Sequence, residues 1–228
     1  MNIVRFETAF AERFPSRVRS LPNYEHWDPI IAHGLDLCPD VKGMLSIKKQ
    51  QLLNLAFSLL DEGEAYLEVG TYQGKCLLSA MIGNSSRPVF ACDNFSQFDD
   101  NTFEQAKQNL AAYGLFDKVR FYDCDFSEIY TPERLPVPIG LYFYDGAHDY
   151  DSQYQAIARI EPFLAREALV MVDDWRLAED SQSHAKSATE AAIRDSGGQW
   201  RVLFELPARF NGDRAMWWNG VGVLSYKR

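Results

Sequence analysis

Hydrophobic and polar residues follow two distinct periods along most of the chain. Leucine and alanine recur at helical spacing over residues 44–61, and a five-residue apolar run follows at 65–69, which predicts a helix and then a buried strand. The same alternation continues as far as residue 195. It predicts further helices over 75–82, 102–113, 153–164 and 183–195, and further strands over 88–92, 119–122, 139–144 and 168–172.

Two more strands are expected near the C-terminus, over 200–205 and 221–226. The connection between them is too short for a crossover helix, so they should pair antiparallel. The preceding strand–helix alternation predicts a parallel sheet with helices on both faces, in the α/β class. Residues 44–228 form this domain. Residues 1–43 carry four prolines and one short helical pattern near 6–14, so we interpret them as an N-terminal arm that packs on the domain or covers a site.

Length and charge narrow the classes of function. The 228 residues suit one globular domain, and a net charge of −9 makes a nonspecific nucleic-acid partner unexpected. No apolar run approaches the roughly 20 residues that span a bilayer, and the N-terminus has no signal-peptide pattern, so no membrane partner is expected. The four cysteines are scattered without a CxxC pair. Reduced thiols in a cytoplasmic protein are the better interpretation.

The first strand of the domain ends in a glycine turn that suggests a ligand site. Gly70 and Gly74 allow a tight turn and close approach of the backbone to a ligand, but their spacing is not that of a GxGxxG phosphate loop. Glu68 precedes them. Its carboxylate would repel a pyrophosphate and suits an ammonium or sulfonium group instead.

The next two strands end in residues that suit an adenosine. Asp93 lies 25 residues after Glu68, where an acidic side chain can accept hydrogen bonds from both ribose hydroxyls. After the third strand, Asp125 could accept from the adenine amine and Phe126 could stack on the ring. Asp123 is the competing candidate for the adenine contact.

Three further carboxylates are expected to converge at the same edge of the sheet. Asp145 follows the fourth strand, and Asp173 and Asp174 follow the fifth. Left unpaired, these groups would repel one another, and a divalent cation would resolve the repulsion. Ligation by oxygen atoms favours Mg²⁺, or Mn²⁺ or Ca²⁺, over zinc. The alternative is that some of them cap helices or pair with Arg176.

The order of these motifs resembles the class I S-adenosylmethionine-dependent methyltransferases over residues 44–228. The run Glu68-x-Gly70-x-Tyr72-x-Gly74 is similar to the E-x-G-x-Y-x-G variant of small O-methyltransferases. The resemblance implies a Rossmann-like sheet of seven strands, the last one antiparallel. It also implies that S-adenosyl-L-methionine is the cofactor, with Glu68 and Gly70 near its methionine portion.

The metal end is similar to the cation-dependent O-methyltransferases related to macrocin O-methyltransferase. Catechol-type enzymes place a lysine base three residues after the first aspartate, where this chain has His148. The resemblance implies a hydroxylated small-molecule acceptor, such as a sugar or another natural product. A histidine with a pKa near 6.5 suits a general base at neutral pH, so His148 is the expected catalytic residue.

The sequence does not decide which residues line the acceptor site or whether the chain forms oligomers. Trp175, the N-terminal arm and the connection between the last two strands could line the acceptor site; that connection contains Asn211, Arg214, Trp217, Trp218 and Asn219. Trp217 and Trp218 could equally form a contact in a homo-oligomer. Two rival functions are a dinucleotide-dependent oxidoreductase, which the missing GxGxxG disfavours, and a binding protein without turnover.

Overall fold

The computed structural model describes residues 1–14, 36–84, 87–98, 101–176 and 183–228. Its strands are β1 (Ala65–Val69), β2 (Val89–Asp93), β3 (Val119–Asp123), β4 (Ile139–Tyr144), β5 (Leu164–Asp173), β6 (Gln199–Leu206) and β7 (Val221–Lys227). Its α-helices are α1 (Ile3–Arg13), α2 (Ile47–Ser58), α3 (Lys75–Met81), α4 (Thr102–Ala112), α5 (Tyr150–Ile160) and α6 (Ala185–Asp195).

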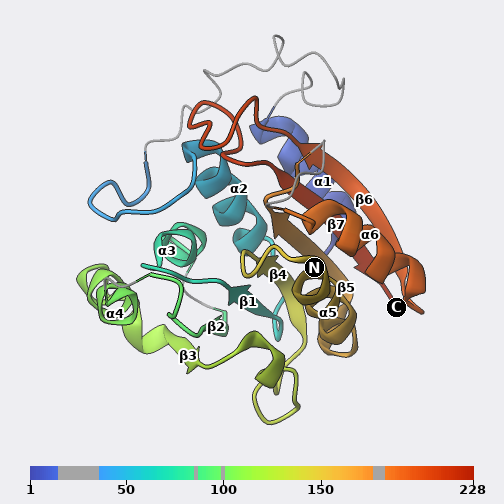
Figure 1. Ribbon diagram of the computed structural model, residues 1–228, viewed down its shortest axis with the longest axis horizontal. Coiled ribbons are helices and arrows are strands. Elements are labelled where there is room, and N and C mark those ends of the chain that lie inside the picture. The colour runs from blue at the N-terminus through green and yellow to red at the C-terminus, as the bar shows by residue number, and fades with distance from the viewer. Residues whose placement is uncertain (15–35, 85–86, 99–100, 177–182) are drawn as a thin grey trace.

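The seven strands form one sheet in the order β3-β2-β1-β4-β5-β7-β6. Every pair from β3 to β5 is parallel, whereas β7 runs antiparallel to both β5 and β6 (Figure 1). The chain reverses its strand order beside β1, where β4 is added on the other side from β2. Ligands of open α/β sheets bind beyond the carboxyl ends of the strands at this kind of switch point.

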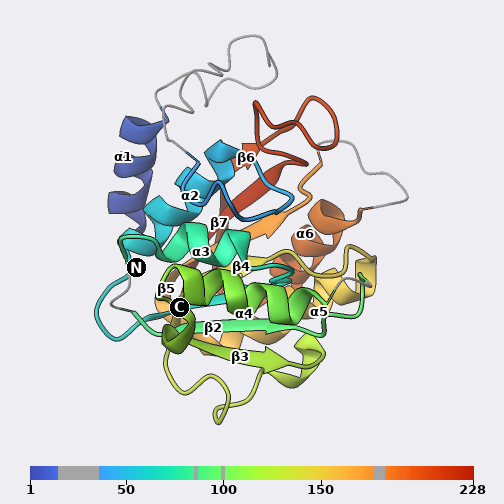
Figure 2. The ribbon, with the colours of Figure 1, turned by 90° about the vertical axis from the view of Figure 1, so that its left-hand side faces the viewer.

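Helices cover both faces of the sheet, so the molecule has three layers (Figure 2). One core lies between the sheet and α1 to α4, and contains Phe6, Leu52, Leu77 and Leu110. A second core lies between the other face and the pair α5 and α6, and contains Ile157 and Ala192. The α/β class, the seven strands and the single antiparallel strand are therefore confirmed. No helix among the described residues is long and apolar enough to cross a membrane.

The predicted elements exist, but several ends differ from the sequence prediction. The helix expected over 44–61 begins at Ile47, because the Ser46 side chain accepts a hydrogen bond from the Lys49 amide and caps it. The helix expected over 153–164 begins at Tyr150 and ends at Ile160. Asp149 caps its start, and a 3-10 turn containing Pro162 follows its end. The chain then enters β5 four residues earlier than predicted.

The described part of the N-terminal arm packs against the sheet. Helix α1 buries Phe6 and Phe10, and the Phe10 ring stacks on Phe204 of β6 with ring centroids 4.1 Å apart. Phe14 then packs on Trp217, with ring centroids 5.2 Å apart. The prolines Pro15, Pro22 and Pro29 and the histidines His26 and His33 lie outside the described residues. The expectation that the arm covers the site depends on that segment and stays a prediction.

Candidate active site

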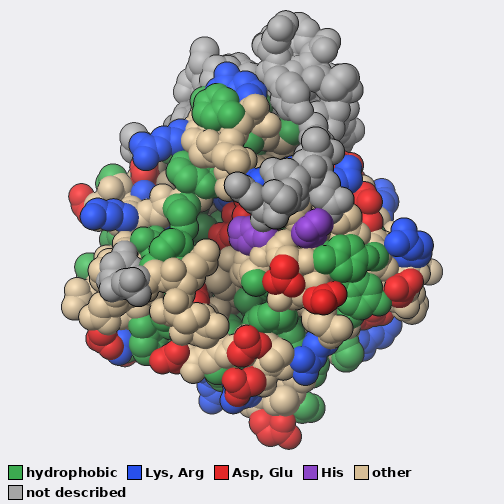
Figure 3. All heavy atoms as spheres, in the orientation of Figure 1, with side chains coloured by type: hydrophobic (Ala, Val, Ile, Leu, Met, Phe, Trp, Pro, Cys, Tyr) green, Lys and Arg blue, Asp and Glu red, His purple; other side chains and the backbone are tan. Residues whose placement is uncertain are grey.

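The carboxyl ends of β1 to β5 surround a cavity of about 870 Å³. It opens on the face seen in Figure 3, where histidine side chains lie beside a hollow with acidic groups at its edge. The charged residues that line it are mostly acidic. The described residues that line it include two histidines and no lysine or arginine, but six aspartates: Asp93, Asp125, Asp145, Asp149, Asp173 and Asp174.

The glycine turn after β1 forms one wall of this cavity. Gly70 has φ +88°, and a Cβ atom built there would lie 1.9 Å from the Asp145 carbonyl oxygen. Only glycine therefore fits where the tips of β1 and β4 meet. Tyr72, with φ 49°, also lines the cavity. Gly74 is the N-cap residue before α3, with φ 82°, but is not among the lining residues, so glycine is needed there for its backbone conformation.

Asp93, at the end of β2, accepts hydrogen bonds from the loops that follow β1 and β2, beside the cavity. Its Oδ2 accepts a hydrogen bond from the Tyr72 amide and its Oδ1 accepts one from the Phe95 amide, both at 2.8 Å. Each carboxylate oxygen has a second lone pair, so the group can still accept from a ligand hydroxyl. Asp93 is thus held in a fixed orientation at the cavity wall.

Glu68 lies behind the cavity and does not line it. Its side chain is fully buried, and Oε2 accepts a 2.6 Å hydrogen bond from the Tyr66 hydroxyl. Burial, opposed by the Tyr66 hydrogen bond and assisted by the charge of Asp93, raises the pKa of Glu68 to about 8. Its Oε1 is buried without a hydrogen-bond partner. The sequence suggested that this carboxyl group contacts a cofactor. A cofactor in the cavity could do so only if it reached past the lining residues to Glu68.

The two candidates for the adenine contact are separated by the structure. Asp125 and Phe126 line the cavity, whereas Asp123 is exposed and is not a lining residue. The Asp125 carboxylate accepts a hydrogen bond from the Ser127 amide, which fixes it at the start of a 3-10 turn. The Phe126 ring packs edge-on against Tyr144, with centroids 5.7 Å apart.

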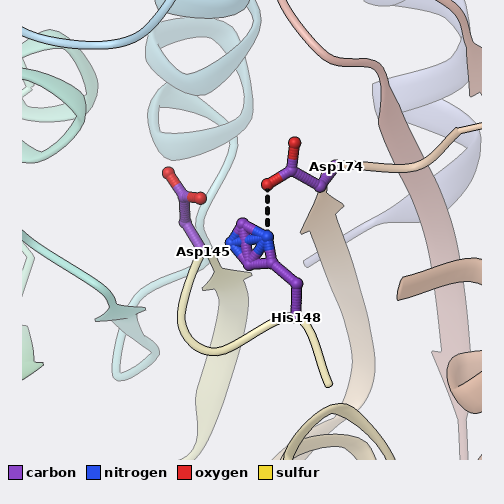
Figure 4. Close-up of side chains that lie close together, drawn as sticks. All are labelled: Asp145, His148 and Asp174. Atoms are coloured by element: carbon purple, nitrogen blue, oxygen red, sulfur yellow. Dashed lines mark ion pairs between the residues drawn. The ribbon is translucent and has the colours of Figure 1, made fainter. Parts of the chain in front are cut away.

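Three residues that follow two neighbouring strands converge at the β4 and β5 end of the cavity. Asp145 follows β4, Asp174 follows β5, and the ring of His148 lies between them (Figure 4). Each offers a ligand atom, and these three atoms lie within 4.8 Å of one another. His148 Nδ1 is 2.7 Å from Asp174 Oδ2, and its loop is held by a hydrogen bond from the His184 amide to the His148 carbonyl oxygen.

The electrostatics of this cluster follow from burial and from charge pairs. Burial, joined by the charge of Asp173, raises the pKa of Asp145 well above its usual value. The hydrogen bond to Asp174 raises the pKa of His148 above 6.5, against the effect of burial. Burial alone would raise the pKa of Asp174, but the hydrogen bond and charge of His148 outweigh it, and the pKa is lowered. Asp174 Oδ1 is buried without a hydrogen-bond partner, and Arg176 Nη2 lies 3.7 Å from it.

The adjacent aspartates at the end of β5 point to different partners. Asp174 has φ 52°, a strained conformation for an aspartate, and its side chain reaches His148. Asp173 instead forms a buried ion pair with Lys49 of α2, whose Nζ lies 2.5 and 2.6 Å from the two carboxylate oxygens. Burial by itself lowers the pKa of Lys49, but Asp173 and Asp145 reverse this and raise it. One of the three carboxylates that the sequence predicted for the cation site, Asp173, is therefore paired with a lysine.

Some of the residues that the sequence suggested for the acceptor wall line the cavity, and others do not. Trp218 and Asn219 line the cavity, but Asn211 and Arg214 do not. Trp175 and Trp217 are buried within the chain, with 0% and 1% of their surfaces exposed. Trp217 packs on Phe14, so it is unavailable for an oligomer contact in this conformation.

Sequence reasoning missed several residues of the site. Lys49 touches Asp173, and the other missed residues line the cavity: Met44, Phe95, Phe98 and His184. Lys49 had one signal in the sequence. It belongs to a run of four polar residues, 48–51, inside a helix with an otherwise apolar pattern, and all four are buried. A buried polar run of this kind indicates partners elsewhere in the fold.

Comparisons with known proteins agree with this architecture. Residues 67–175 match the family model of a methyltransferase domain. No curated protein matches the chain. The O-methyltransferase TomG from Streptomyces achromogenes, which is involved in tomaymycin synthesis and whose structure is in complex with S-adenosylmethionine, is 16% identical. The alignment covers 100% of both chains, with a TM-score of 0.61.

Two other solved structures show how widely the fold is shared. The cofactor-bound protein Rv0187 from Mycobacterium tuberculosis is 19% identical over 90% of this chain and 93% of its own, with a TM-score of 0.59. Precorrin-6y C5,15-methyltransferase from Geobacter metallireducens is 13% identical over 86% and 99%, with a TM-score of 0.55. Residues 67–175 therefore match a methyltransferase domain, and the chain shares its fold with these solved structures, two of which are methyltransferases.

Proposed function

We propose that the chain transfers a methyl group from S-adenosyl-L-methionine to a hydroxyl group of a small molecule, with a divalent cation at Asp145 and Asp174. The observation that carries the proposal is the cluster of Asp145, His148 and Asp174, which faces the same cavity as the glycine turn. The fold is shared with a C-methyltransferase. The choice of an oxygen acceptor therefore rests on this cluster.

The cofactor assignment follows the shape and charge of the cavity. Gly70 and Tyr72 form the turn, Asp93 would bind the ribose hydroxyls, and Asp125 and Phe126 would contact the adenine; all five line the cavity. The aspartate-rich lining favours a cofactor with a cationic sulfonium over a dinucleotide with a pyrophosphate. Glu68 and Gly74 would support this half from behind the cavity wall.

The donor set fits a hard divalent cation such as Mg²⁺ or Mn²⁺. Asp174 Oδ1 is a buried oxygen without a hydrogen-bond partner, and Asp145 is a carboxyl group that burial alone would hold protonated. A bound cation would supply charge for both oxygens and would lower the pKa of an acceptor hydroxyl. Asp145 and Asp174 would hold it, with a third oxygen provided by the acceptor.

His148 is proposed as the general base. Asp174 accepts from its Nδ1, so the other nitrogen, Nε2, carries the lone pair that can take the acceptor proton. The same contact orients the ring, as the carboxylate does in a base–orienter pair. A histidine that coordinates the cation through Nε2 could not act in this way. The two roles are therefore exclusive and can be separated by experiment.

The decisive experiment combines binding and single-turnover measurements on the wild type and His148→Gln. S-adenosylhomocysteine should bind the wild type and raise its melting temperature, whereas NAD should not. Methyl transfer to hydroxylated acceptors should stop in EDTA and return with Mg²⁺ or Mn²⁺. His148→Gln should keep its affinity for the cofactor product and for Mn²⁺, and should lose about 10²–10⁴-fold in rate.

Each outcome has a distinct meaning. Full activity in excess chelator would refute the cation role. A His148→Gln protein that no longer binds Mn²⁺ would make His148 a ligand, and Asp149 would become the next candidate for the base. Stabilisation by NAD but not by S-adenosylhomocysteine would favour the oxidoreductase.

A further inference from the structure

The buried ion pair between Lys49 and Asp173 is a feature of the site that the proposed reaction does not use. Both side chains are almost fully inaccessible, with exposed fractions of 1% and 5%. The pair joins α2 to the end of β5, two elements far apart in the chain. Lys49 also lies outside the residues that match the methyltransferase family model.

The charges around the proposed cation site show what this lysine does. Asp145, Asp173 and Asp174 together would carry three negative charges when ionised, and the charge of Asp173 raises the pKa of Asp145. One lysine ammonium reduces the sum to two. Arg176, 3.7 Å from Asp174 Oδ1, offsets part of the remainder, and a bound cation would compensate the rest of the buried negative charge.

The backbone gives the pair a second effect. Asp173 Oδ1, which contacts Lys49, also accepts a 2.8 Å hydrogen bond from the Asp174 amide. Asp174 adopts φ 52° directly after it, so its side chain turns away from Lys49 and toward His148. The lysine thereby holds one aspartate out of the cation site while the other is presented to it.

We propose that Lys49 is a positioning residue that acts as the internal counter-ion of the site, so that Asp173 stays paired with lysine and the divalent cation is held by Asp145 and Asp174. This inference rests on the proposed cation site. It assigns Asp173 a different role from its neighbour, although the two are adjacent in the sequence.

The test is a double-mutant cycle on the full chain, with Mn²⁺ alone as the probe, read by calorimetry and electron paramagnetic resonance. Lys49→Met should bind Mn²⁺ about tenfold more tightly or better, because an added negative charge beside the site attracts the cation. Asp173→Asn should bind it about tenfold more weakly, because the lysine charge is then uncompensated. The double variant should return to within about threefold of the wild type.

Lys48→Met is the matched control. Lys48 is the neighbouring buried residue of the same helix, and its Nζ contacts Met216 and the Trp217 ring instead. Its substitution should leave Mn²⁺ affinity within about threefold of the wild type. Without cation, Lys49→Met should also melt at a lower temperature than the double variant, because it leaves a buried carboxylate unpaired.

Two results would overturn the inference. Unchanged or weaker Mn²⁺ binding in Lys49→Met would show that the lysine charge does not act on the site. A double variant as weak as Asp173→Asn would make Asp173 a metal ligand. If Lys49→Met fails to fold, the comparison of Asp173→Asn with the double variant decides: tenfold tighter binding by the double variant supports the inference, and equal binding refutes it.

Failure of the proposed function would be seen separately. Binding of S-adenosylhomocysteine is measured in the same preparations and does not depend on the lysine. If the wild type binds no Mn²⁺ while Lys49→Met does, the counter-ion role stands and the cation dependence of the reaction is refuted.

Discussion

Individual side chains in the cavity and behind its wall owe their protonation states to their immediate surroundings. His148 and Glu68 show opposite causes of a raised pKa. A carboxylate partner at 2.7 Å stabilises the protonated imidazole, whereas full burial disfavours the ionised form of Glu68. Each cause predicts a pH dependence that a single substitution removes.

For His148, the pKa should fall when its partner loses its charge. In cation-free protein the imidazole should titrate above 6.5, and Asp174→Asn should move the titration to lower pH. Nuclear magnetic resonance of the ring protons measures both. Because a base must be unprotonated, the rate of methyl transfer should rise with pH through the pKa that His148 has in the cation-loaded protein. Identical titration curves in the two proteins would contradict the pairing.

For Glu68, stability should depend on pH near neutrality. A carboxyl group whose pKa is about 8 in the folded chain and near 4.5 in the unfolded chain stabilises the fold below the lower value. That contribution is lost as pH rises through about 8, by as much as ~4 kcal/mol. Glu68→Gln should flatten the dependence. Urea unfolding between pH 5 and 9 measures it, and parallel curves for the two proteins would be the contrary result.

Among the secondary-structure elements, strand ends determine the site. The tips of β1 and β4 are in direct contact, because the Asp145 amide donates to the Val69 carbonyl oxygen and Gly70 leaves no room for a Cβ atom. The proposed cofactor turn and the proposed cation turn therefore share one backbone junction.

Gly70→Ala should disturb both turns. We expect the free energy of unfolding to fall by ~3 kcal/mol or more, from overpacking and from the positive φ together. Gly83→Ala is the control, since Gly83 has φ +77° with nothing within 4 Å of a built Cβ. It should cost about 1 kcal/mol from conformation alone. Chemical denaturation compares them, and equal losses would show that the junction is not tightly packed.

Sequence periodicity was sufficient for the elements but not for their ends or for cross-element contacts. The apolar runs at 65–69 and 139–144 predicted buried strands because their hydrophobicity is local information. The start of α5 depended on a cap at Asp149, which the apolar pattern does not contain. The partner of Asp173 comes from a helix 124 positions earlier, and no local pattern reports such a contact.

At the scale of the whole molecule, the N-terminal helix is part of the folded core. Phe10 of helix α1 packs on the outer strand β6, and Phe14, directly after the helix, packs on the connection before β7. The described residues of the helix are not among those that line the cavity. Its contribution should therefore be to stability.

Phe10→Ala tests this role. The ring is 2% exposed and stacks on Phe204, so its removal should lower the free energy of unfolding by about 3–5 kcal/mol while S-adenosylhomocysteine affinity stays unchanged. Val4→Ala, on the same helix but 72% exposed, should cost almost nothing. Thermal denaturation and calorimetry separate the two effects. Weaker cofactor binding in folded Phe10→Ala would show that the helix influences the site.

The cavity is built from two kinds of chain segment. The part next to the sheet is formed by strand ends within residues 67–175. Backbone pairing of β1 with β2 and with β4 fixes their positions. The remaining wall of the cavity comes from Met44, His184, Trp218 and Asn219, which are attached to connections outside that span. Substitutions in those connections leave the strand ladder intact. Under the proposed function, substitutions at Met44, His184, Trp218 or Asn219 should therefore change the choice of acceptor while the affinity for the methyl donor is kept.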